Sequence, residues 1–202
     1  MKGIIEVVTD NEMQIASMLS KSRSDIFLES RGYIRKSLAN LFNLNPLDIP
    51  IEANPGKAPK LPKGMGQISI SHCNDALIII WHTEKVGIDI ERSDRDFKYK
   101  DIAKKYCFNF DQLKKGNIND KNEVLRQWSA IEAAIKLDKG TLSKDLKEWK
   151  YLSNKNTLFH KKKNLKLYIN QLNFYQWTIS IAYEARDNLA IQEIICNNTI
   201  FP

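Results

Sequence analysis

The sequence of 202 residues predicts an α+β protein made of two lobes of similar size. Both halves of the chain contain segments with apolar residues at helical spacing, together with short β-branched runs bounded by turn residues. A polar stretch at residues 92–96 separates the halves. We therefore expect a first lobe at residues 1–93 and a second at 94–202. Each lobe should be a small antiparallel sheet packed with helix, with a site between them.

Two helices and four strands are expected in the first lobe. Apolar residues at helical spacing indicate helices over residues 11–19 and 26–44. The β-branched runs indicate strands at residues 3–8, 67–72, 76–81 and 86–91. A loop rich in Pro, Gly and Lys at residues 54–64 has little core-forming content, which favours a functional role.

The second lobe is expected to contain one long amphipathic helix over residues 121–137. Four apolar residues stack on one face of this helix, namely Val124, Trp128, Ile131 and Ile135. Shorter helices are predicted at residues 101–106 and 111–115. The remaining extended segments predict strands at residues 149–152, 165–172, 177–183 and 189–195.

The net charge of +7 is concentrated in the second lobe. Residues 1–93 contain 11 Lys and Arg and 11 Asp and Glu, so the excess positive charge lies in residues 94–202. A basic lobe favours an anionic partner, namely nucleic acid, a phosphorylated ligand or an acidic protein. A solvated Lys-rich surface is the alternative. Because no groove-reading motif and no aromatic-basic interleaving is present, we expect no nucleic acid partner.

The sequence shows no signal for membrane insertion or secretion. No apolar run approaches the roughly 20 residues of a membrane helix, and residues 1–6 lack the apolar core of a signal peptide. Cys73, Cys107 and Cys196 are scattered without metal-ligand spacing, so we expect reduced thiols. A cytoplasmic protein is therefore expected.

Two acidic residues in the predicted strand at residues 86–91 form the first candidate site. Asp89 and Glu91 are two residues apart, so their side chains point to the same face. Ile88 and Ile90 then face the core. Adjacent carboxylates repel each other unless a cation lies between them, and Mg²⁺ binds a few carboxylates together with water and substrate phosphates. A pair of solvent-facing acids on an edge strand is the alternative.

A carboxylate and an amine in the predicted long helix form the second candidate site. Glu132 and Lys136 are four residues apart and share a helix face with Trp128. In a functional site, Glu132 would approach a metal ion or act as a base, and Lys136 would contact a phosphate. An ordinary helix salt bridge, worth about 0.3–0.5 kcal/mol, is the alternative.

Further candidate phosphate contacts lie at a strand end and in the Pro-rich loop. Ser71 and His72 end a predicted strand, where a hydroxyl, a turn amide and an imidazole can hold a phosphate oxygen. A capping serine and a surface histidine are the alternative. Lys57 in the loop is another candidate. The chain has no Walker A loop, no G-x-G-x-x-G and no G-x-S-x-G around Ser71.

Taken in order, these segments resemble the sequence pattern of the Sfp-type 4′-phosphopantetheinyl transferases. That pattern is a Gly-Lys-Pro loop, a Ser-His pair, a (I/V)-G-(I/V)-D-(I/V)-E strand, a W-x-x-K-E-x-x-x-K helix and a Gly-containing turn. The matching segments here are Gly56-Lys57-Ala58-Pro59, Ile70-Ser71-His72, Val86-Gly87-Ile88-Asp89-Ile90-Glu91, Trp128…Glu132…Lys136 and Lys139-Gly140.

The resemblance implies a fold and a reaction. The fold would be two pseudo-twofold-related α+β lobes with coenzyme A bound in the cleft between them. The reaction would transfer the 4′-phosphopantetheine arm of coenzyme A to a serine of an apo carrier protein, releasing 3′,5′-adenosine bisphosphate. Magnesium would be required. Such a two-lobed chain supplies both walls of its cleft, so we expect a monomer.

The resemblance also implies roles for individual residues. Asp89, Glu91 and Glu132 would bind Mg²⁺, and Glu132 would help to deprotonate the incoming serine. Lys136 would contact the phosphates, making Glu132, Lys136 and Asp89 the catalytic residues. The remaining residues expected to bind coenzyme A are Ser71 and His72 at its 3′-phosphate, and Lys57, Arg23, Arg31 and Asp111.

One position departs from the family pattern. The lysine that precedes the helix glutamate in the family is Ile131 here, on the apolar face of the predicted helix. A weakened family member that binds coenzyme A or a carrier without efficient transfer is therefore the alternative function.

Carrier proteins of this class are typically acidic. We expect docking on the basic second lobe, with contacts from Lys144, Lys147, Lys150 and residues 161–163.

Overall fold

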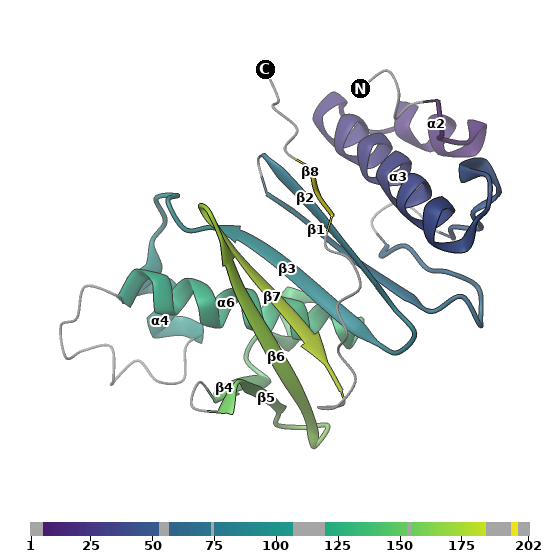
Figure 1. The fold of residues 1–202 in the computed structure, drawn as a ribbon. Coiled ribbons are helices and arrows are strands. Elements are labelled where there is room, and N and C mark those ends of the chain that lie inside the picture. The colour runs from purple at the N-terminus through teal and green to yellow at the C-terminus, as the bar shows by residue number, and fades with distance from the viewer. Residues whose placement is uncertain are drawn as a thin grey trace. The chain divides into compact units, whose positions relative to one another are not determined.

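The computed structural model describes residues 6–52, 57–73, 75–106, 120–152, 155–184 and 195–197. The fold is α+β, with two antiparallel sheets and several helices, as the sequence predicts (Figure 1). The chain divides into two compact units, Met1–Met65 and Gly66–Pro202.

The first unit is helical in its described part. It contains α2 (Asp10–Ser17), α3 (Lys21–Phe42) and the short helix η1 (Pro46–Asp48). Thr9 and Glu12 form a capping box at the start of α2. The predicted strand at residues 3–8 is wrong over its described part, because residues 6–8 are turn and bend that lead into this cap.

A buried ion pair holds the helices of the first unit together. Arg35 of α3 donates to both carboxylate oxygens of Glu12, at 3.0 Å to Oε2 and 3.2 Å to Oε1. Its Nη1 also donates to the main-chain oxygen of Ile49 at 2.7 Å. One guanidinium therefore ties α2, α3 and the segment after η1 together.

The second unit contains both sheets. The three-stranded sheet has the order β1-β2-β8 and is formed by β1 (Gln67–Cys73), β2 (Ala76–His82) and β8 (Ile195–Asn197). The five-stranded sheet has the order β3-β7-β6-β5-β4. Its strands are β3 (Val86–Arg92), β4 (Trp149–Leu152), β5 (Thr157–His160), β6 (Leu165–Phe174) and β7 (Trp177–Tyr183).

Each face of the five-stranded sheet is covered. Ile88 and Ile90 of β3 pack with isoleucines of β2 and β7, which confirms that they face a core. The other face carries α6 (Asp120–Leu137), whose apolar residues form a second core with β4, β5 and β6. The helices α4 (Tyr99–Tyr106) and α7 (Leu142–Asp145) flank α6 in sequence. Of the helices in the described ranges, none is both long and apolar enough to cross a membrane.

The sheet topology differs from the expectation of one sheet in each half of the chain. β3, before residue 93, pairs with β7 from the second half, and Asp89 lies opposite Ser180. The five-stranded sheet therefore crosses the predicted boundary at residue 93, and the compact units divide at Met65 instead. β5 was not predicted. The predicted helix at 111–115 and residues 189–194 of the predicted strand at 189–195 lie outside the described residues.

Gly87 allows α6 to lie very close to β3. A Cβ atom at this position would stand 2.0 Å from the main-chain oxygen of Ala133 and 2.7 Å from the main-chain nitrogen of Leu137. Real Cβ atoms do not approach other atoms so closely, and the obstacle is backbone, which cannot move aside without shifting the helix. Any residue other than glycine would push α6 away from the sheet.

We expect Gly87→Ala to destabilise the protein by about 3 kcal/mol or more, because the methyl group overpacks a backbone contact. Denaturant unfolding followed by circular dichroism measures this change. Gly64→Ala is the matched control: nothing lies within 4 Å of its added Cβ, although φ at this residue is +97°. The control should lose only about 1–2 kcal/mol from backbone strain. Equal losses in both variants would contradict the packing role of Gly87.

Candidate functional site

The predicted carboxylates of β3 lie on the face of the sheet that α6 covers. Asp89 is 2% exposed and Glu91 is 8% exposed. β3 is an edge strand of its sheet, as the alternative interpretation of Asp89 and Glu91 expected. Its two acids are nevertheless buried, because α6 packs over them, so the solvent-facing alternative is wrong.

Lys136 reaches from α6 to the first of these acids. Its Nζ lies 2.7 Å from Asp89 Oδ1 and 2.8 Å from Ser71 Oγ. Ser71 in turn donates to Asp89 Oδ1 at 2.9 Å. Three residues that are far apart in the sequence therefore meet at one carboxylate oxygen.

The hydroxyl of Ser71 has no hydrogen-bonding capacity to spare. It also accepts from the main-chain nitrogen of Ile90 at 3.3 Å, so its one proton and both lone pairs are engaged. Ser69 makes the equivalent contact one step along β1, accepting from the main-chain nitrogen of Ile88 at 3.1 Å. Sequence reasoning missed Ser69, although the Ser-x-Ser alternation in β1 could have indicated it.

Glu91 has a partner on each of its carboxylate oxygens. The indole Nε1 of Trp128 donates to Oε1 at 3.1 Å. Arg95 Nη1 lies 2.8 Å from Oε2. Trp128 and Lys136 are eight residues apart on α6, so the helix contacts both acids of β3 from positions about two turns apart. Sequence reasoning did not single out Arg95.

The third carboxylate, Glu132, shares this environment. Burial raises the pKa of Glu132 to about 8, with a further contribution from the negative charge of Asp89 and a smaller one from Glu91. Burial, followed by Asp89, also raises the pKa of Glu91. These mutual effects mean that the three predicted carboxylates lie close enough to repel one another.

These residues fit a divalent cation. Asp89 Oδ2 is buried and has no hydrogen-bond partner among the described residues. A buried carboxylate oxygen without a partner is costly, and a hard cation with oxygen ligands would satisfy it. The part of the chain that the structure describes contains no three acidic, His or Cys side chains already in a ready-made metal geometry. Asp89, Glu91 and Glu132 would therefore have to close around the ion.

His72 and Ile131 flank this group of residues differently. His72 is an exposed residue of β1, and partial burial of its ring, followed by the charge of Lys136, lowers its pKa. It therefore lies within electrostatic reach of the site. Ile131 is 1% exposed and belongs to the core beneath α6. The expectation that Ile131 is a core residue is confirmed.

The remaining predicted ligands lie elsewhere in the chain. Arg23 and Lys57 are exposed residues of the first unit. Arg31 is buried there, 3.9 Å from Glu12 Oε1 and stacked over the ring of Phe27. Nucleotide binding by these three residues stays a prediction, and Asp111 lies outside the described residues.

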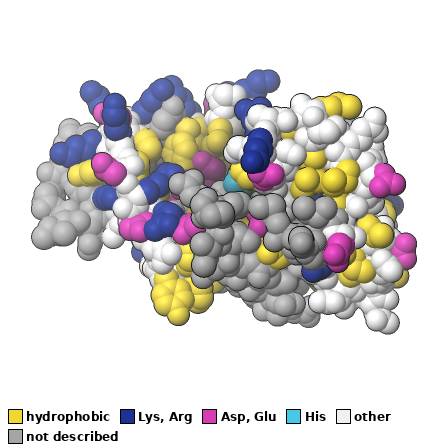
Figure 2. All heavy atoms as spheres, turned by 90° about the horizontal axis from the view of Figure 1, so that it is seen from above, with side chains coloured by type: hydrophobic (Ala, Val, Ile, Leu, Met, Phe, Trp, Pro, Cys, Tyr) yellow, Lys and Arg dark blue, Asp and Glu magenta, His cyan; other side chains and the backbone are white. Residues whose placement is uncertain are grey.

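The lysines predicted to dock a carrier protein are exposed but not all unpaired. Lys162 pairs with Glu148 at 2.8 Å, and Lys163 pairs with Asp138. Lys144, Lys147 and Lys150 are also exposed. Figure 2 shows dark blue Lys and Arg side chains beside magenta acids on the surface, so the positive charge is locally mixed with negative charge.

Comparison of the sequence with protein-family models and with curated proteins finds no match in either case. A function for this chain therefore has to come from the residues of the site themselves.

We expect Glu132→Gln to stabilise the metal-free protein above neutral pH. Glu132 has a folded-state pKa near 8 and an ordinary value of 4.5. As the pH rises from 4.5 to 8, Glu132 ionises in the unfolded chain while it stays protonated in the folded protein. The free energy of unfolding therefore falls over this pH range. The loss is on the order of 3–5 kcal/mol and is complete above about pH 8. Glutamine mimics the protonated acid and removes this loss.

Thermal melts in the presence of a chelator between pH 5 and 9 measure this effect. The melting temperature of the wild type should fall more steeply with pH than that of Glu132→Gln. The exposed Glu84→Gln serves as the control and should follow the wild type. Parallel curves for the wild type and Glu132→Gln would show that Glu132 is not held in a charge-repelling environment.

Proposed function

We propose that this protein transfers the 4′-phosphopantetheine arm of coenzyme A to a serine of an acidic apo carrier protein, with Mg²⁺, and releases 3′,5′-adenosine bisphosphate. The observation that carries the proposal is the meeting of Asp89, Glu91, Glu132 and Lys136 at the contact of β3 with α6. Three carboxylates with one unpaired buried oxygen suit a magnesium ion, and the lysine suits the phosphates of a substrate.

The residues of the site can be given roles in this reaction. The serine oxygen of the carrier forms a bond to the phosphorus of the phosphopantetheine arm, and the bond from that phosphorus to the adenosine bisphosphate breaks. Glu132 takes the proton of the serine, and Lys136 neutralises charge on the phosphate oxygens. A magnesium ion held by Asp89, Glu91 and Glu132 would supply further charge neutralisation at the diphosphate.

Ser71 supports these roles from β1. Because its hydroxyl contacts Asp89 and Lys136 together, it fixes the distance between a metal-binding carboxylate and the phosphate-binding amine. His72, next along the strand, has no such commitment and is the better placed of the two for the 3′-phosphate. No covalent enzyme intermediate is needed, since the carrier brings its own nucleophile.

A second candidate function is a weakened family member that binds coenzyme A or a carrier without efficient transfer. Ile131 favours it, because this residue is packed in the core where the family pattern has a lysine. The two functions differ in a single measurable outcome, the modification of a carrier.

We expect an apo carrier protein incubated with the wild type, coenzyme A and Mg²⁺ to gain the mass of one phosphopantetheine arm in intact-protein mass spectrometry. Glu132→Gln should abolish the gain, because the amide cannot take the serine proton or serve as an anionic ligand. The exposed Glu84→Gln is the control and should keep wild-type transfer.

Three outcomes separate the candidates. Transfer by the wild type and none by a folded Glu132→Gln supports the transferase. Coenzyme A binding with no mass gain on several apo carriers supports the weakened member. Full transfer by Glu132→Gln would remove Glu132 from its role.

We expect reversal of Lys144, Lys147 and Lys150 to glutamate to weaken the apparent affinity for the carrier about tenfold at low salt, because exposed charges steer an acidic partner. The difference from the wild type should shrink as salt is added, and the affinity for coenzyme A should not change. An unchanged carrier affinity at low salt would exclude this surface as the docking site.

A further inference from the structure

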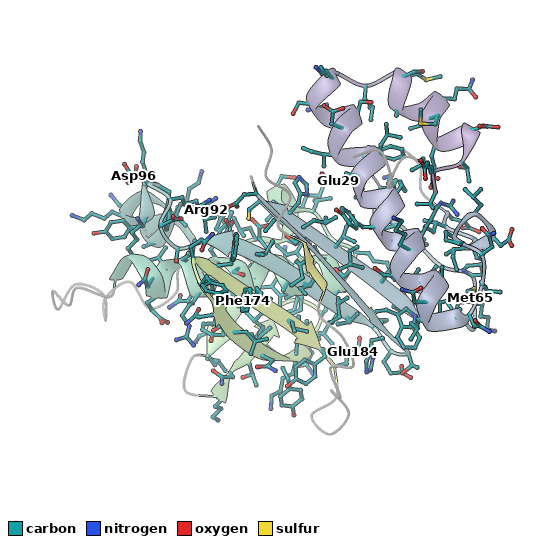
Figure 3. The ribbon with its side chains drawn as sticks, turned by 45° about the horizontal axis from the view of Figure 1, so that its top comes forward. Glu29, Met65, Arg92, Asp96, Phe174 and Glu184 are labelled. Atoms are coloured by element: carbon teal, nitrogen blue, oxygen red, sulfur yellow. The ribbon has the colours of Figure 1, made fainter. Side chains whose placement is uncertain are left out.

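Glu91 is held by two partners of different kinds. Trp128 donates to Oε1 from within α6, a packed helix. Arg95 binds Oε2 from the segment between β3 and α4, and its side chain is 39% exposed. Figure 3 labels Arg92, the last residue of β3, and Asp96, which follows Arg95 in the sequence. The partner on Oε1 is fixed by packing, whereas the partner on Oε2 has solvent on one side.

The charges of the site make Arg95 important. Three carboxylates meet two cations, Lys136 and Arg95, within the described residues of this site. Arg95 contacts this group directly, with its Nη1 2.8 Å from Glu91 Oε2. Lys136 contacts Asp89 and Ser71, so the two cations neutralise different acids of β3.

The neighbouring arginine has a different role. Arg92 forms ion pairs with Asp75 and Asp94, on both sides of its guanidinium, and does not contact the three carboxylates. Arg95 stacks over the ring of Phe97 at 5.1 Å, which orients the guanidinium but leaves donors on its edge. Of these two arginines, only Arg95 contacts one of the three carboxylates, and it does so from a position that is exposed to solvent.

We propose that Arg95 is a second diphosphate-binding residue that changes partner when the ligand binds. In the ligand-free protein it neutralises Glu91, and with coenzyme A bound it donates to the diphosphate. This inference rests on the proposed function. A guanidinium matches the geometry of phosphate oxygens at least as well as that of a carboxylate. When Arg95 leaves Glu91, Glu91 Oε2 is free to bind a cation. The guanidinium then supplies a positive charge at the diphosphate, in place of the lysine that the family pattern has at position 131.

Binding measurements test the exchange with two probes. ADP carries the diphosphate but lacks the 3′-phosphate and the pantetheine arm, and Mn²⁺ alone reports on the carboxylates. We expect Arg95→Gln to weaken ADP and coenzyme A binding about tenfold in calorimetry, because a charge-assisted hydrogen bond is lost. The same variant should bind Mn²⁺ several-fold more tightly in electron paramagnetic resonance, because Oε2 has lost its competing partner.

Lys98→Gln is the matched control, since it removes the same charge from an exposed residue three positions away. It should change either affinity by less than about twofold. Arg95→Lys keeps the charge but not the planar fork, so ADP should bind with intermediate affinity. Melting temperatures of all variants establish that they are folded. If Arg95→Gln is unfolded, the ADP affinity of Arg95→Lys tests the proposal instead.

The outcomes distinguish this inference from the proposed function. A wild type that binds neither coenzyme A nor ADP overturns both. A wild type that binds both ligands, with Arg95→Gln indistinguishable from Lys98→Gln, overturns the role of Arg95 and leaves the transferase standing. Weaker ADP binding without tighter Mn²⁺ binding would show that Arg95 binds the diphosphate but does not compete for Glu91, which overturns the exchange.

Discussion

The close contact of α6 with β3 at Gly87 determines the geometry of the whole site. Across this contact Trp128 binds Glu91, Lys136 binds Asp89, and the main chain at Ala133 lies against Gly87. Trp128 and Lys136 are eight residues apart on the helix, about 12 Å, whereas Glu91 and Asp89 are two residues apart on the strand, about 6.6 Å. The long side chains of Trp128 and Lys136 make up this difference, and the close backbone contact at Gly87 keeps the helix within their reach.

Local sequence patterns predicted much of this arrangement. Alternation placed Asp89 and Glu91 on one face of β3, and helical spacing placed Lys136 and Ile131 on different faces of α6. Both follow from backbone geometry alone. The burial of the acids did not follow, because it depends on a helix that begins at Asp120, far along the chain. The pairing of β3 with β7 was missed for the same reason, since periodicity does not identify a partner strand.

Charged residues were the hardest to interpret, because the sequence does not show which residues they pair with. The family resemblance assigned Arg31 to coenzyme A, yet Arg31 is buried beside Glu12, which lies on another helix, and Arg35 is buried at the same carboxylate. Arg95 lies in a polar stretch that suggests only a linker, and its contact with Glu91 exists because the chain bends after β3. In each case the charge was visible in the sequence and its partner was not.

The serine hydroxyls on β1 affect whether strands of other protein molecules can pair with the edge of the five-stranded sheet. An edge strand with free main-chain donors is a template on which a strand of another molecule can add, leading to aggregation. Ser69 and Ser71 occupy the donors of Ile88 and Ile90 on β3. Side chains thus close these two positions of the edge to a foreign strand, although β3 has no neighbouring strand on that side of its own sheet.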